Sequence, residues 1–525
     1  MSKNSLGREL PEQVGNYCVR PYEGAYQPLP EAKPVVTRRT AGHRVPGGNK
    51  LVPTLKDAII ASGLKDGMTI SFHHSFREGD KVIGQVLTAI RALGIKGLRF
   101  APSAVVNIKE PSIVDFVKDG TINRIEASGI RGQLGDAILS GEVELAEPVI
   151  LRTHGGRPRA IEAGELQIDV AFIGASAADD YGNCTSQIGP NACGSMGYSF
   201  VDAHNAGCVV VVTDNLVDYP CCPVSISQQY VDYVVKVDSI GDPAKIGAGA
   251  ARLTKNPRDL MIAQRTVDVM AASRRFKDGF SFQTGAGAIS IATTKYLAER
   301  MKERGVKASF ALGGIPAAII DMYDEGLVRV VACSQSFDAV AAQAISSRPG
   351  VIEIDNADYA NAYSKGGYLN REDFGILGAL EVDTDFNVNI LTGSSGEMRG
   401  GLGGGPDVAG GAQVSIVTIH REEGVHHLHP RRDRCRGGDR GGHRPEPQAQ
   451  ELSGAEGGPG GRRFEAGDHR GASAAGRVHD RRPQAHRDRR QSGLHGGIPG
   501  RQRGRRDPPD QKVIIPQEQS WNMDE

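Results

Sequence analysis

Short apolar runs alternate with stretches of helical periodicity along the first 419 residues of the chain. Three of these runs are rich in β-branched residues and occupy residues 170–176, 208–216 and 232–238. Runs of this length and composition predict strands that are buried on both faces of a parallel sheet. Residues 54–64 and 81–93 instead carry apolar side chains at helical spacing. The alternation predicts an α/β fold in which helices cover mostly parallel sheets.

Part of this pattern occurs twice. The stretch LKDGMTISFHHSFREGD (64–80) aligns with FKDGFSFQTGAGAIS (276–290), and the segments at 94–100 and 305–312 also correspond. In each copy a Lys-Asp-Gly turn opens a strand, which ends in a polar or glycine-rich loop before a helix. Chance similarity is the alternative, because strand–helix units recur in α/β folds. We interpret the repeat as two homologous domains that face each other across a substrate site.

The composition changes abruptly after residue 420. Residues 421–511 contain no lysine, tyrosine or tryptophan, and their apolar residues are too sparse to bury a core. We therefore expect a disordered tail and a second domain that lacks its last strands. The predicted parts are an N-terminal extension, a first domain, a truncated second domain and the tail, at residues 1–50, 51–255, 256–419 and 420–525.

Three explanations of the tail compete: a basic arm for nucleic acid, a histidine-rich metal site at HHLH (426–429), and translation in a shifted frame. The HHLH run lacks the partner cysteines or acids of a zinc site. Suitable codons for residues 496–511 become VEYRDGSVVDVIRQI when one base is dropped, a plausible strand, turn and strand. The same offset converts residues 425–434 to FTTCIRDVT. We favour the frameshift, and expect neither a nucleic-acid partner nor a metal.

Charge and cysteine content narrow the class of protein further. The formal net charge is zero, so the chain as a whole shows no preference for a polyanionic partner. Its polar beginning and the lack of a run of about 18 apolar residues predict neither a secretory signal nor a membrane span. The eight cysteines include no CxxC pair. Free thiols in the reducing cytoplasm are therefore the expectation.

The loop after the first repeated strand, SFHHSFREGD, carries His73, His74 and Arg77. Open α/β sheets bind ligands at the carboxyl ends of their strands. Arginine and histidine at that position can hold the carboxylates of an anionic substrate. A capped loop with one histidine packed inward is the other interpretation.

The matching second loop begins with Gln283 and leads into a helix. Its small residues allow backbone N–H groups to approach an anion or a developing oxyanion. These residues are Gly285, Ala286, Gly287 and Ala288. The sequence contains no GxxxxGK[ST], GxSxG or HExxH motif, which disfavours nucleotide triphosphatases, hydrolases and metallopeptidases.

A glycine-dense segment, residues 389–415, contains Asp407. Such a segment is either a flexible linker or a loop that wraps against a ligand. The apolar strands on either side favour the loop, and Asp407 is a candidate site residue.

Several blocks between about residues 50 and 418 together resemble the citrate lyase α subunit family. The recovered VEYRDGSVVDVIRQI also looks like the C-terminal strand pair of that family. The blocks are the two repeated loops, SGIRG (128–132), THGGR (153–157), GELQIDVAFIGAS (164–176), KVDSIGDPAKIGAGA (236–250), FALGGI (310–315), QSFD (335–338) and DFNVNILTGSSG (385–396).

The resemblance implies two tandem domains of the CoA-transferase type, which are similar to ribose-phosphate isomerase, and a citrate CoA-transferase activity. The reaction converts acetyl-acyl carrier protein and citrate to citryl-acyl carrier protein and acetate. Implied partners are a γ subunit, the acyl carrier protein with a CoA-like phosphopantetheine-type arm, and a β subunit that cleaves the citryl thioester to oxaloacetate. This chain itself is expected to bind no cofactor and no membrane.

The resemblance also suggests roles for particular residues. His73, His74 and Arg77 would position citrate, and the loop that begins at Gln283 would stabilise oxyanions. Gly313 and Gly314 would receive the thioester arm together with the glycines of that loop. The segment AADDYGN (177–183) is similar to a signature of wider CoA-transferases and adds Asp179, Gly182 and Asn183. No glutamate nucleophile can be singled out, so transfer within a ternary complex is expected. Alternatives are the α subunits of citramalate lyase or malonate decarboxylase, and a non-catalytic assembly subunit.

Overall fold

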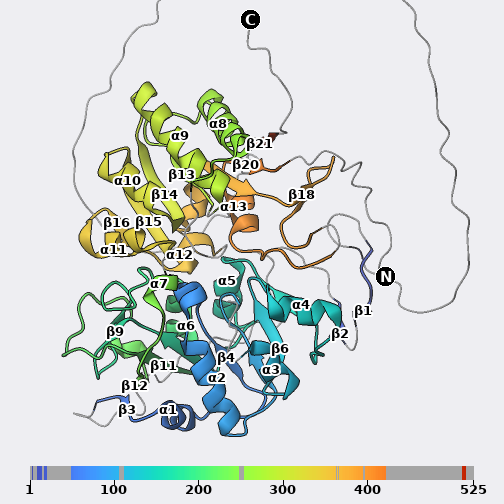
Figure 1. Cartoon of the computed structure of the whole chain (residues 1–525), viewed down its shortest axis with the longest axis vertical. Helices are drawn as coiled ribbons and strands as arrows, with labels where there is room; N and C mark the ends of the chain where they lie inside the picture. The colour runs from blue at the N-terminus through green and yellow to red at the C-terminus, as the bar shows by residue number, and fades with distance from the viewer. Residues whose placement is uncertain are drawn as a thin grey trace, which may run out of the picture. The chain divides into compact units, whose positions relative to one another are not determined.

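A computed structural model describes most of the chain up to His420 and one short segment near its end (Figure 1). Most of the predicted tail, residues 421–510 and 516–525, lies outside the described residues, as does most of the N-terminal extension. The described residues are 3, 9–14, 17–19, 49–105, 112–246, 253–285, 287–361, 364, 366–393, 396–420 and the strand 511–515.

The first sheet has eight parallel strands in the order β3-β12-β11-β8-β4-β5-β6-β7. The three β-branched runs of the sequence lie in β8, β11 and β12, as predicted. The strands are β3 (Leu51–Val52), β4 (Thr69–Ser71), β5 (Leu98–Phe100), β6 (Ile122–Ala127), β7 (Ile150–Leu151), β8 (Val170–Gly174), β11 (Cys208–Thr213) and β12 (Tyr233–Lys236). The accompanying helices are α1 (Leu55–Ser62), α2 (Val82–Ala92), α3 (Ile113–Lys118), α4 (Gln133–Ser140), α5 (Gly156–Glu162), α6 (Ser199–Asn205) and α7 (Pro243–Ile246).

The second sheet has seven parallel strands in the order β16-β15-β14-β13-β17-β20-β21. Helices α8 and α9 pack side by side (Figure 1). The strands are β13 (Ser281–Gln283), β14 (Ala308–Ile315), β15 (Val328–Ser336), β16 (Val351–Glu353), β17 (Phe374–Gly378), β20 (Val414–Thr418) and β21 (Gln511–Ile515). The helices are α8 (Pro257–Ala272), α9 (Ala288–Arg304), α10 (Ala317–Asp324), α11 (Ala339–Ser347), α12 (Asn356–Ala360) and α13 (Gly405–Gly411).

The two sheets repeat one strand order. When the strands of each sheet are read from edge to edge, their order along the chain is the same. The order is β12-β11-β8-β4-β5-β6-β7 in the first sheet and β21-β20-β17-β13-β14-β15-β16 in the second. The Lys-Asp-Gly turns repeat the same bond: Asp66 Oδ1 accepts a hydrogen bond from Lys96 N at 2.8 Å, and Asp278 Oδ1 accepts one from Lys307 N at 3.0 Å. A bond repeated at matching positions is not expected by chance, which supports the duplication.

Local sequence explains where the helices begin and end. Helix α1 starts after Thr54, whose hydroxyl accepts a hydrogen bond from Asp57 N at 3.2 Å. It ends at Gly63, whose φ of 72° is one that glycine adopts without steric cost. Apolar faces of the helices and both faces of the strands bury separate cores in the two halves.

Strand β21 lies in the tail that the sequence predicts to be disordered. It pairs in parallel with β20, from Val414 with Gln511 to Thr418 with Ile515. Its place is that of β12 in the first sheet. Without it the outer edge of β20 would present unpaired backbone groups, and the run KVII has the composition of a strand. Apart from His420 and the strand 511–515, the tail predicted to be frameshifted and disordered lies outside the described residues.

The glycine-dense segment of the second half packs against the first half. Gly401 and Gly129 form an antiparallel bridge, and a Cβ on either glycine would lie within 2.7 Å of the other residue's Cα. Leu402 N donates to Ser128 O, and His154 N donates to Gly403 O, both at 2.8 Å. The segment is therefore a loop that contacts the first half.

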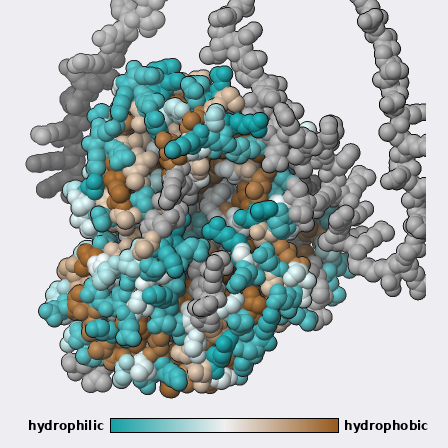
Figure 2. Space-filling model, viewed as in Figure 1, coloured by the Kyte–Doolittle hydropathy of each residue, from teal (hydrophilic) through white to brown (hydrophobic). Residues whose placement is uncertain are grey.

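Polar side chains cover most of the face seen in Figure 2, with smaller apolar patches between them. Among the helices that the structure describes, none is long and apolar enough to cross a bilayer. The cysteines of the described residues are free thiols.

Candidate functional site

Two cavities lie where the glycine-dense segment meets the first half. The first, of about 680 Å³, includes Gln283 and is called the Gln283 cavity. The second, of about 670 Å³, includes Arg152 and is called the Arg152 cavity. Tyr359, Leu402 and Pro406 line both cavities and therefore form a shared wall.

The Gln283 cavity lies at the carboxyl ends of the strands in the second sheet. Gln283 ends β13, Gly314 lies near the end of β14 and Gln335 near the end of β15, and all three line the cavity. His154 and Tyr198 of the first half also line it. This is the edge at which parallel sheets bind ligands.

The side-chain amide of Gln283 makes one hydrogen bond through its nitrogen, and its oxygen accepts none from the described residues. Its Nε2 donates to the Tyr359 hydroxyl at 2.9 Å, while its Oε1 is buried and has no hydrogen-bond partner among the described residues. Gly313 makes this arrangement possible, because its φ is 93° and a Cβ would lie 2.8 Å from the Gln283 Cδ. Gly314 has no space for a Cβ either, since one would lie 2.0 Å from the Phe337 ring.

His74 lines neither cavity, but it belongs to a cluster of rings with His154 and Tyr198, which line the Gln283 cavity. Its ring centroid lies 4.4 Å from that of Tyr198 and 5.8 Å from that of His154. The Tyr198 hydroxyl lies 3.3 Å from His154 Nε2 and donates to Gln335 Oε1 at 3.4 Å. The Gln335 amide reaches back to His74 O at 3.5 Å. These contacts connect the first repeated loop to the edge of the second sheet.

Burial makes both histidines of the cluster weak bases. It holds the pKa of His74 well below the usual range, and the nearby charges of His154 and Arg77 lower it further. Burial, followed by the charge of Arg157, lowers the pKa of His154 to about 4. Both rings are therefore neutral at pH 7, and each offers one donor and one acceptor nitrogen.

His73 lies outside both cavities and is the histidine that packs inward. Its Nε2 lies 2.7 Å from Asp202 Oδ2, and Arg157 donates to both oxygens of Asp202 at 2.8 and 2.9 Å. Burial raises the pKa of Asp202, but the charges of Arg157 and His73 hold it well below its usual value. The structure thus separates His73 from its neighbour His74.

Arg77 reaches the second half through Phe337. Its NH1 donates to Phe337 O at 3.1 Å, and its guanidinium carbon lies 5.1 Å from the centre of the Phe337 ring, which lines the Gln283 cavity. The backbone of Arg77 has φ 53° and ψ −135°, an unfavourable conformation for a residue with a side chain. Such strain persists where the surrounding structure imposes it, often at functional sites.

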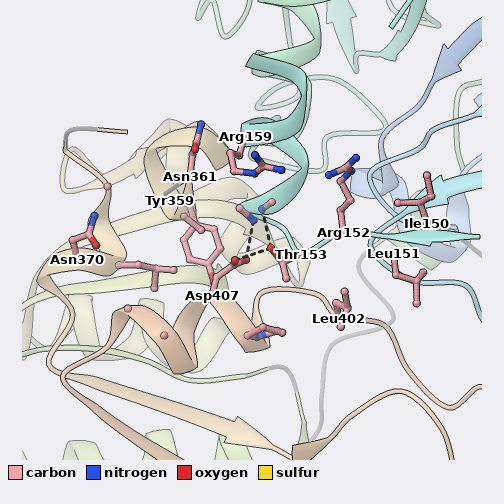
Figure 3. Close-up of a pocket in the computed structure, with 18 residues that line it drawn as sticks. Ile150, Leu151, Arg152, Thr153, Arg159, Tyr359, Asn361, Asn370, Leu402 and Asp407 are labelled. Atoms are coloured by element: carbon pink, nitrogen blue, oxygen red, sulfur yellow. Dashed lines mark hydrogen bonds between the residues drawn. The ribbon is translucent and has the colours of Figure 1, made fainter. Parts of the chain in front are cut away.

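Asp407 lies in the Arg152 cavity and joins the two halves (Figure 3). It accepts hydrogen bonds from the Thr153 hydroxyl at 2.6 Å and from Gly155 N at 2.8 Å. Burial raises the pKa of Asp407 to about 6, against the effect of these two bonds. The candidate residue Asp407 therefore lies at a contact between the glycine-dense loop of the second half and residues 153–155 of the first half.

The arginines of the Arg152 cavity have carboxylate partners. Arg152 pairs with Glu126, and it also pairs with Glu165 at 2.8 Å. Arg159 pairs with the same Glu165 oxygen at 2.5 Å. Their charges are therefore largely neutralised inside the protein, and this cavity is a poorer anion site than its arginines suggest.

The candidates from AADDYGN form an internal turn and line neither cavity. Asp179 Oδ1 accepts from Tyr181 N and Asn183 N, both at 3.0 Å. Asn183 Nδ2 donates to Asp179 Oδ2 at 2.8 Å, and Gly182 has a φ of 98°. Their side chains and backbone shape this turn.

The second repeated loop is only partly in contact with the cavity. Gly285 lines the Gln283 cavity, Gly287 is the N-cap of α9 and Ala288 is its first residue. Ala286 lies outside the described residues. The described residues contain no cluster of three or more metal-binding side chains.

Four residues of the site were not among the sequence candidates: His154, Tyr198, Gln335 and Tyr359. His154 and Gln335 stand in the blocks THGGR and QSFD, which drew attention for their resemblance and not for their chemistry. Tyr198 and Tyr359 have no distinctive sequence context. Tyr359 reaches the cavity through the packing of α12 in the second half, and Tyr198 reaches it through the contact between the two halves.

Comparison with known proteins gives one consistent family. The family model described as "Citrate lyase, alpha subunit (CitF)" matches residues 48–424. A citrate lyase alpha chain from Haemophilus influenzae is 46% identical over 393 residues, which are 75% of this chain and 77% of the relative. A citrate lyase alpha chain from Escherichia coli is 48% identical over 369 residues, which are 70% of this chain and 72% of the relative.

Solved structures agree with this result. A structure described as the alpha subunit of citrate lyase from Streptococcus mutans, in complex with citrate, is 44% identical. Its TM-score is 0.72, and the match covers 79% of this chain and 80% of that chain. The alpha subunit of an Acinetobacter baumannii malonate decarboxylase is 16% identical, with a TM-score of 0.54 over 71% of this chain and 72% of that chain, and shares the fold alone. The predicted α/β fold of the CoA-transferase type is confirmed, and the chain belongs to the citrate lyase alpha subunit family.

Proposed function

We propose that this chain converts acetyl-acyl carrier protein and citrate to citryl-acyl carrier protein and acetate. Membership in the citrate lyase alpha subunit family supports a citrate CoA-transferase activity. The observation that carries the site assignment is one cavity lined by Gln283 and Gly314 of the second half and by His154 and Tyr198 of the first half. His74 packs against the rings of His154 and Tyr198. The bound citrate of the Streptococcus mutans relative supports citrate as the acid.

The reaction needs two exchanges at carbonyl carbons. A citrate carboxylate oxygen attacks the acetyl thioester carbonyl, the C–S bond breaks, and a mixed anhydride and a thiolate result. Attack by that thiolate on the citryl carbonyl then breaks the C–O bond and releases acetate. No proton is gained or lost overall. Each step passes through an oxyanion, which a hydrogen-bond donor stabilises by roughly 3 kcal/mol.

The donors for these oxyanions come from the second half. Gly285 and Gly314 line the cavity, and in this proposal backbone N–H groups at these glycines are the donors. Gln283 keeps one amide hydrogen beyond the one that it donates to Tyr359. These groups assign oxyanion stabilisation to the end of β13 and β14.

The first half supplies the groups that hold the acid. Ser103 Oγ accepts from His74 N at 3.0 Å and lies 2.7 Å from His74 Nδ1, so its own hydrogen can point to that nitrogen. His74 Nε2 then carries the ring hydrogen and can donate to a carboxylate. Arg77 adds a positive charge beside Phe337. In this proposal His73 orients the loop through Asp202 and does not touch substrate.

The name alpha chain indicates an enzyme with several kinds of subunit. The proposal assigns the thioester to a γ subunit, the acyl carrier protein, through a phosphopantetheine-type arm. Cleavage of citryl thioester belongs to a β subunit. In this scheme the chain holds no cofactor of its own and works in the cytoplasm.

Citrate-dependent release of labelled acetate from acetyl-CoA, used in place of the carrier, tests the activity. We expect release with citrate and much less with citramalate or malonate. Gln283→Ala should lower release by 10²-fold or more, because it removes a donor from the cavity. Gln343→Ala, on the exposed face of α11, is the matched control.

Two results would count against the proposal. Preference for citramalate or malonate would indicate a related transferase, and no release with any acid from folded protein would indicate an assembly subunit. An unchanged rate in Gln283→Ala would remove the Gln283 cavity from the reaction.

A further inference from the structure

A third, much smaller cavity lies beneath the first repeated loop. Its volume is about 10 Å³. Its wall is mainly aromatic and aliphatic, with Phe72, Phe76 and Phe172 among the lining residues. Three polar residues also line it: His73, Ser75 and Asp80. The cavity is therefore small, and its otherwise apolar wall carries three polar residues.

Two of the three polar residues have a buried atom without a partner. His73 Nδ1 and Ser75 Oγ are shielded from solvent and have no hydrogen-bond partner among the described residues. Both residues are only 7% exposed. A buried polar atom left unpaired costs about 1–3 kcal/mol, and native proteins rarely contain two in one place.

We propose that this cavity binds one water molecule, which bridges His73 Nδ1, Ser75 Oγ and the Asp80 carboxyl group. A cavity volume of about 10 Å³ is at the lower limit for a single water. A buried water typically needs two to four polar partners, and these three residues provide them. A dry cavity is expected only where the lining is apolar throughout.

A metal ion fits this cavity less well than water. Divalent calcium or magnesium takes six or more oxygen ligands, whereas this wall offers one carboxyl, one hydroxyl and one ring nitrogen. Asp80 Oδ1 is also engaged, since it accepts a hydrogen bond from Ile83 N at 3.0 Å. The cavity thus fits a small neutral molecule that can both donate and accept.

The water would connect the two ends of the loop that carries His74 and Arg77. His73 is fixed on its other side by Asp202, and Asp80 is fixed by the start of α2. A water that bridges His73 and Ser75 to Asp80 links the first residues of the loop to its last residue. The water would thereby stabilise the loop that carries His74 and Arg77. Any effect of this on catalysis rests on the proposed function, whereas the water site itself does not.

A crystal structure of the full chain at about 1.8 Å resolution tests the site directly. We expect one ordered density peak within about 2.6–3.2 Å of His73 Nδ1 and Ser75 Oγ, since these are hydrogen-bond distances. An empty cavity, or a Ser75 hydroxyl bonded directly to His73, would overturn the proposal. Either result would leave the transferase assay unaffected, so the two proposals fail separately.

A pair of serine variants tests the site in solution. Ser75→Ala removes one partner of the water and should lower the unfolding midpoint by about 2–4 °C. Ser140→Ala removes a hydroxyl near the end of α4 that bonds only locally to Ala137 O, and should change the midpoint little. In the Ser75→Ala crystal the peak should weaken or vanish while the peptide backbone stays in place. A peak that persists unchanged would show that Ser75 does not hold it.

Discussion

The Gln283 amide nitrogen donates a hydrogen bond to the Tyr359 hydroxyl across 2.9 Å, at the wall that the Gln283 and Arg152 cavities share. Gln283 ends a strand of the second sheet, while Tyr359 comes from α12. Burial is the main reason that the pKa of Tyr359 lies well above its usual value, so the hydroxyl remains protonated. The tyrosine therefore orients the glutamine for whatever enters the cavity.

Loss of the Tyr359 hydroxyl should weaken catalysis more than folding. Tyr359→Phe leaves the ring in place but frees the Gln283 amide to rotate. We expect citrate-dependent acetate release to fall about 10-fold, which corresponds to about 1.4 kcal/mol of transition-state stabilisation. Steady-state rates measure the effect, with Tyr230→Phe, which lines neither cavity, as the control. Equal rates in the two variants would contradict the positioning role.

The low pKa of His154 predicts a stability change in acid. The folded-state pKa is about 4, below the ordinary value of 6.5, so the unfolded chain binds more protons between these two pH values. Stability should therefore fall as pH drops from 6.5 to 4, by at most about 1.4 kcal/mol per pH unit for this residue. Urea unfolding of wild type and His154→Gln at pH 5 and pH 7 measures it. Between pH 7 and pH 5 the variant should lose less unfolding free energy than the wild type. An equal loss would show that the pKa of His154 is not lowered in the folded protein.

Glu372 predicts a change of the opposite sign. This side chain is 0% exposed, and neither carboxyl oxygen has a hydrogen-bond partner among the described residues. Burial, with the charge of Asp373, raises its pKa well above the usual range. The folded state then binds the extra proton, so stability declines as pH rises from the usual glutamate range through the raised pKa of the folded state. Glu372→Gln, a neutral mimic, should flatten this decline.

The same titration in Glu299→Gln provides the control for Glu372, because Glu299 is exposed on α9. That variant should keep the wild-type slope of unfolding free energy against pH. If Glu372→Gln also keeps it, then the Glu372 carboxyl is charged in the folded protein and has a partner.

Removal of β21 should expose the outer edge of β20. A chain that ends at residue 506 would leave Val414–Thr418 with unpaired backbone groups, which favour edge-to-edge association. We expect this truncation to elute as aggregates in size-exclusion chromatography. A second truncation after Ile515 keeps the strand and serves as the control. Monodisperse behaviour of the shorter chain would show that β21 is dispensable.

Much of the fold follows from the sequence, because buried parallel strands require continuous apolar runs. The runs at β8, β11 and β12 could be recognised for this reason. The duplication was visible in the sequence because the Lys-Asp-Gly turn occurs twice. Asp66 and Asp278 accept equivalent backbone hydrogen bonds in the two turns. The sequence by itself also placed His74, Gln283 and Gly285 after or at strand ends, where a parallel sheet opens to a ligand, whereas Gly314 became a candidate only through the family resemblance.

Tertiary structure alone decided which of these residues meet. His73 and His74 are neighbours in the chain, yet one binds Asp202 in the interior and the other joins the rings of His154 and Tyr198. Adjacent side chains in extended backbone point to opposite sides, and only the packing of the second half determines which side becomes a cavity.

The same reason explains the residues that sequence reasoning misplaced or missed. Asp179 satisfies its own turn, while Tyr359 reaches Gln283 across 76 positions of the chain. The strand β21 pairs with β20 across about 92 residues, a separation over which local pattern carries no information. Short-range periodicity determines strands, helices and turns, whereas contacts between distant segments depend on how the elements pack within each half and how the two halves pack against each other.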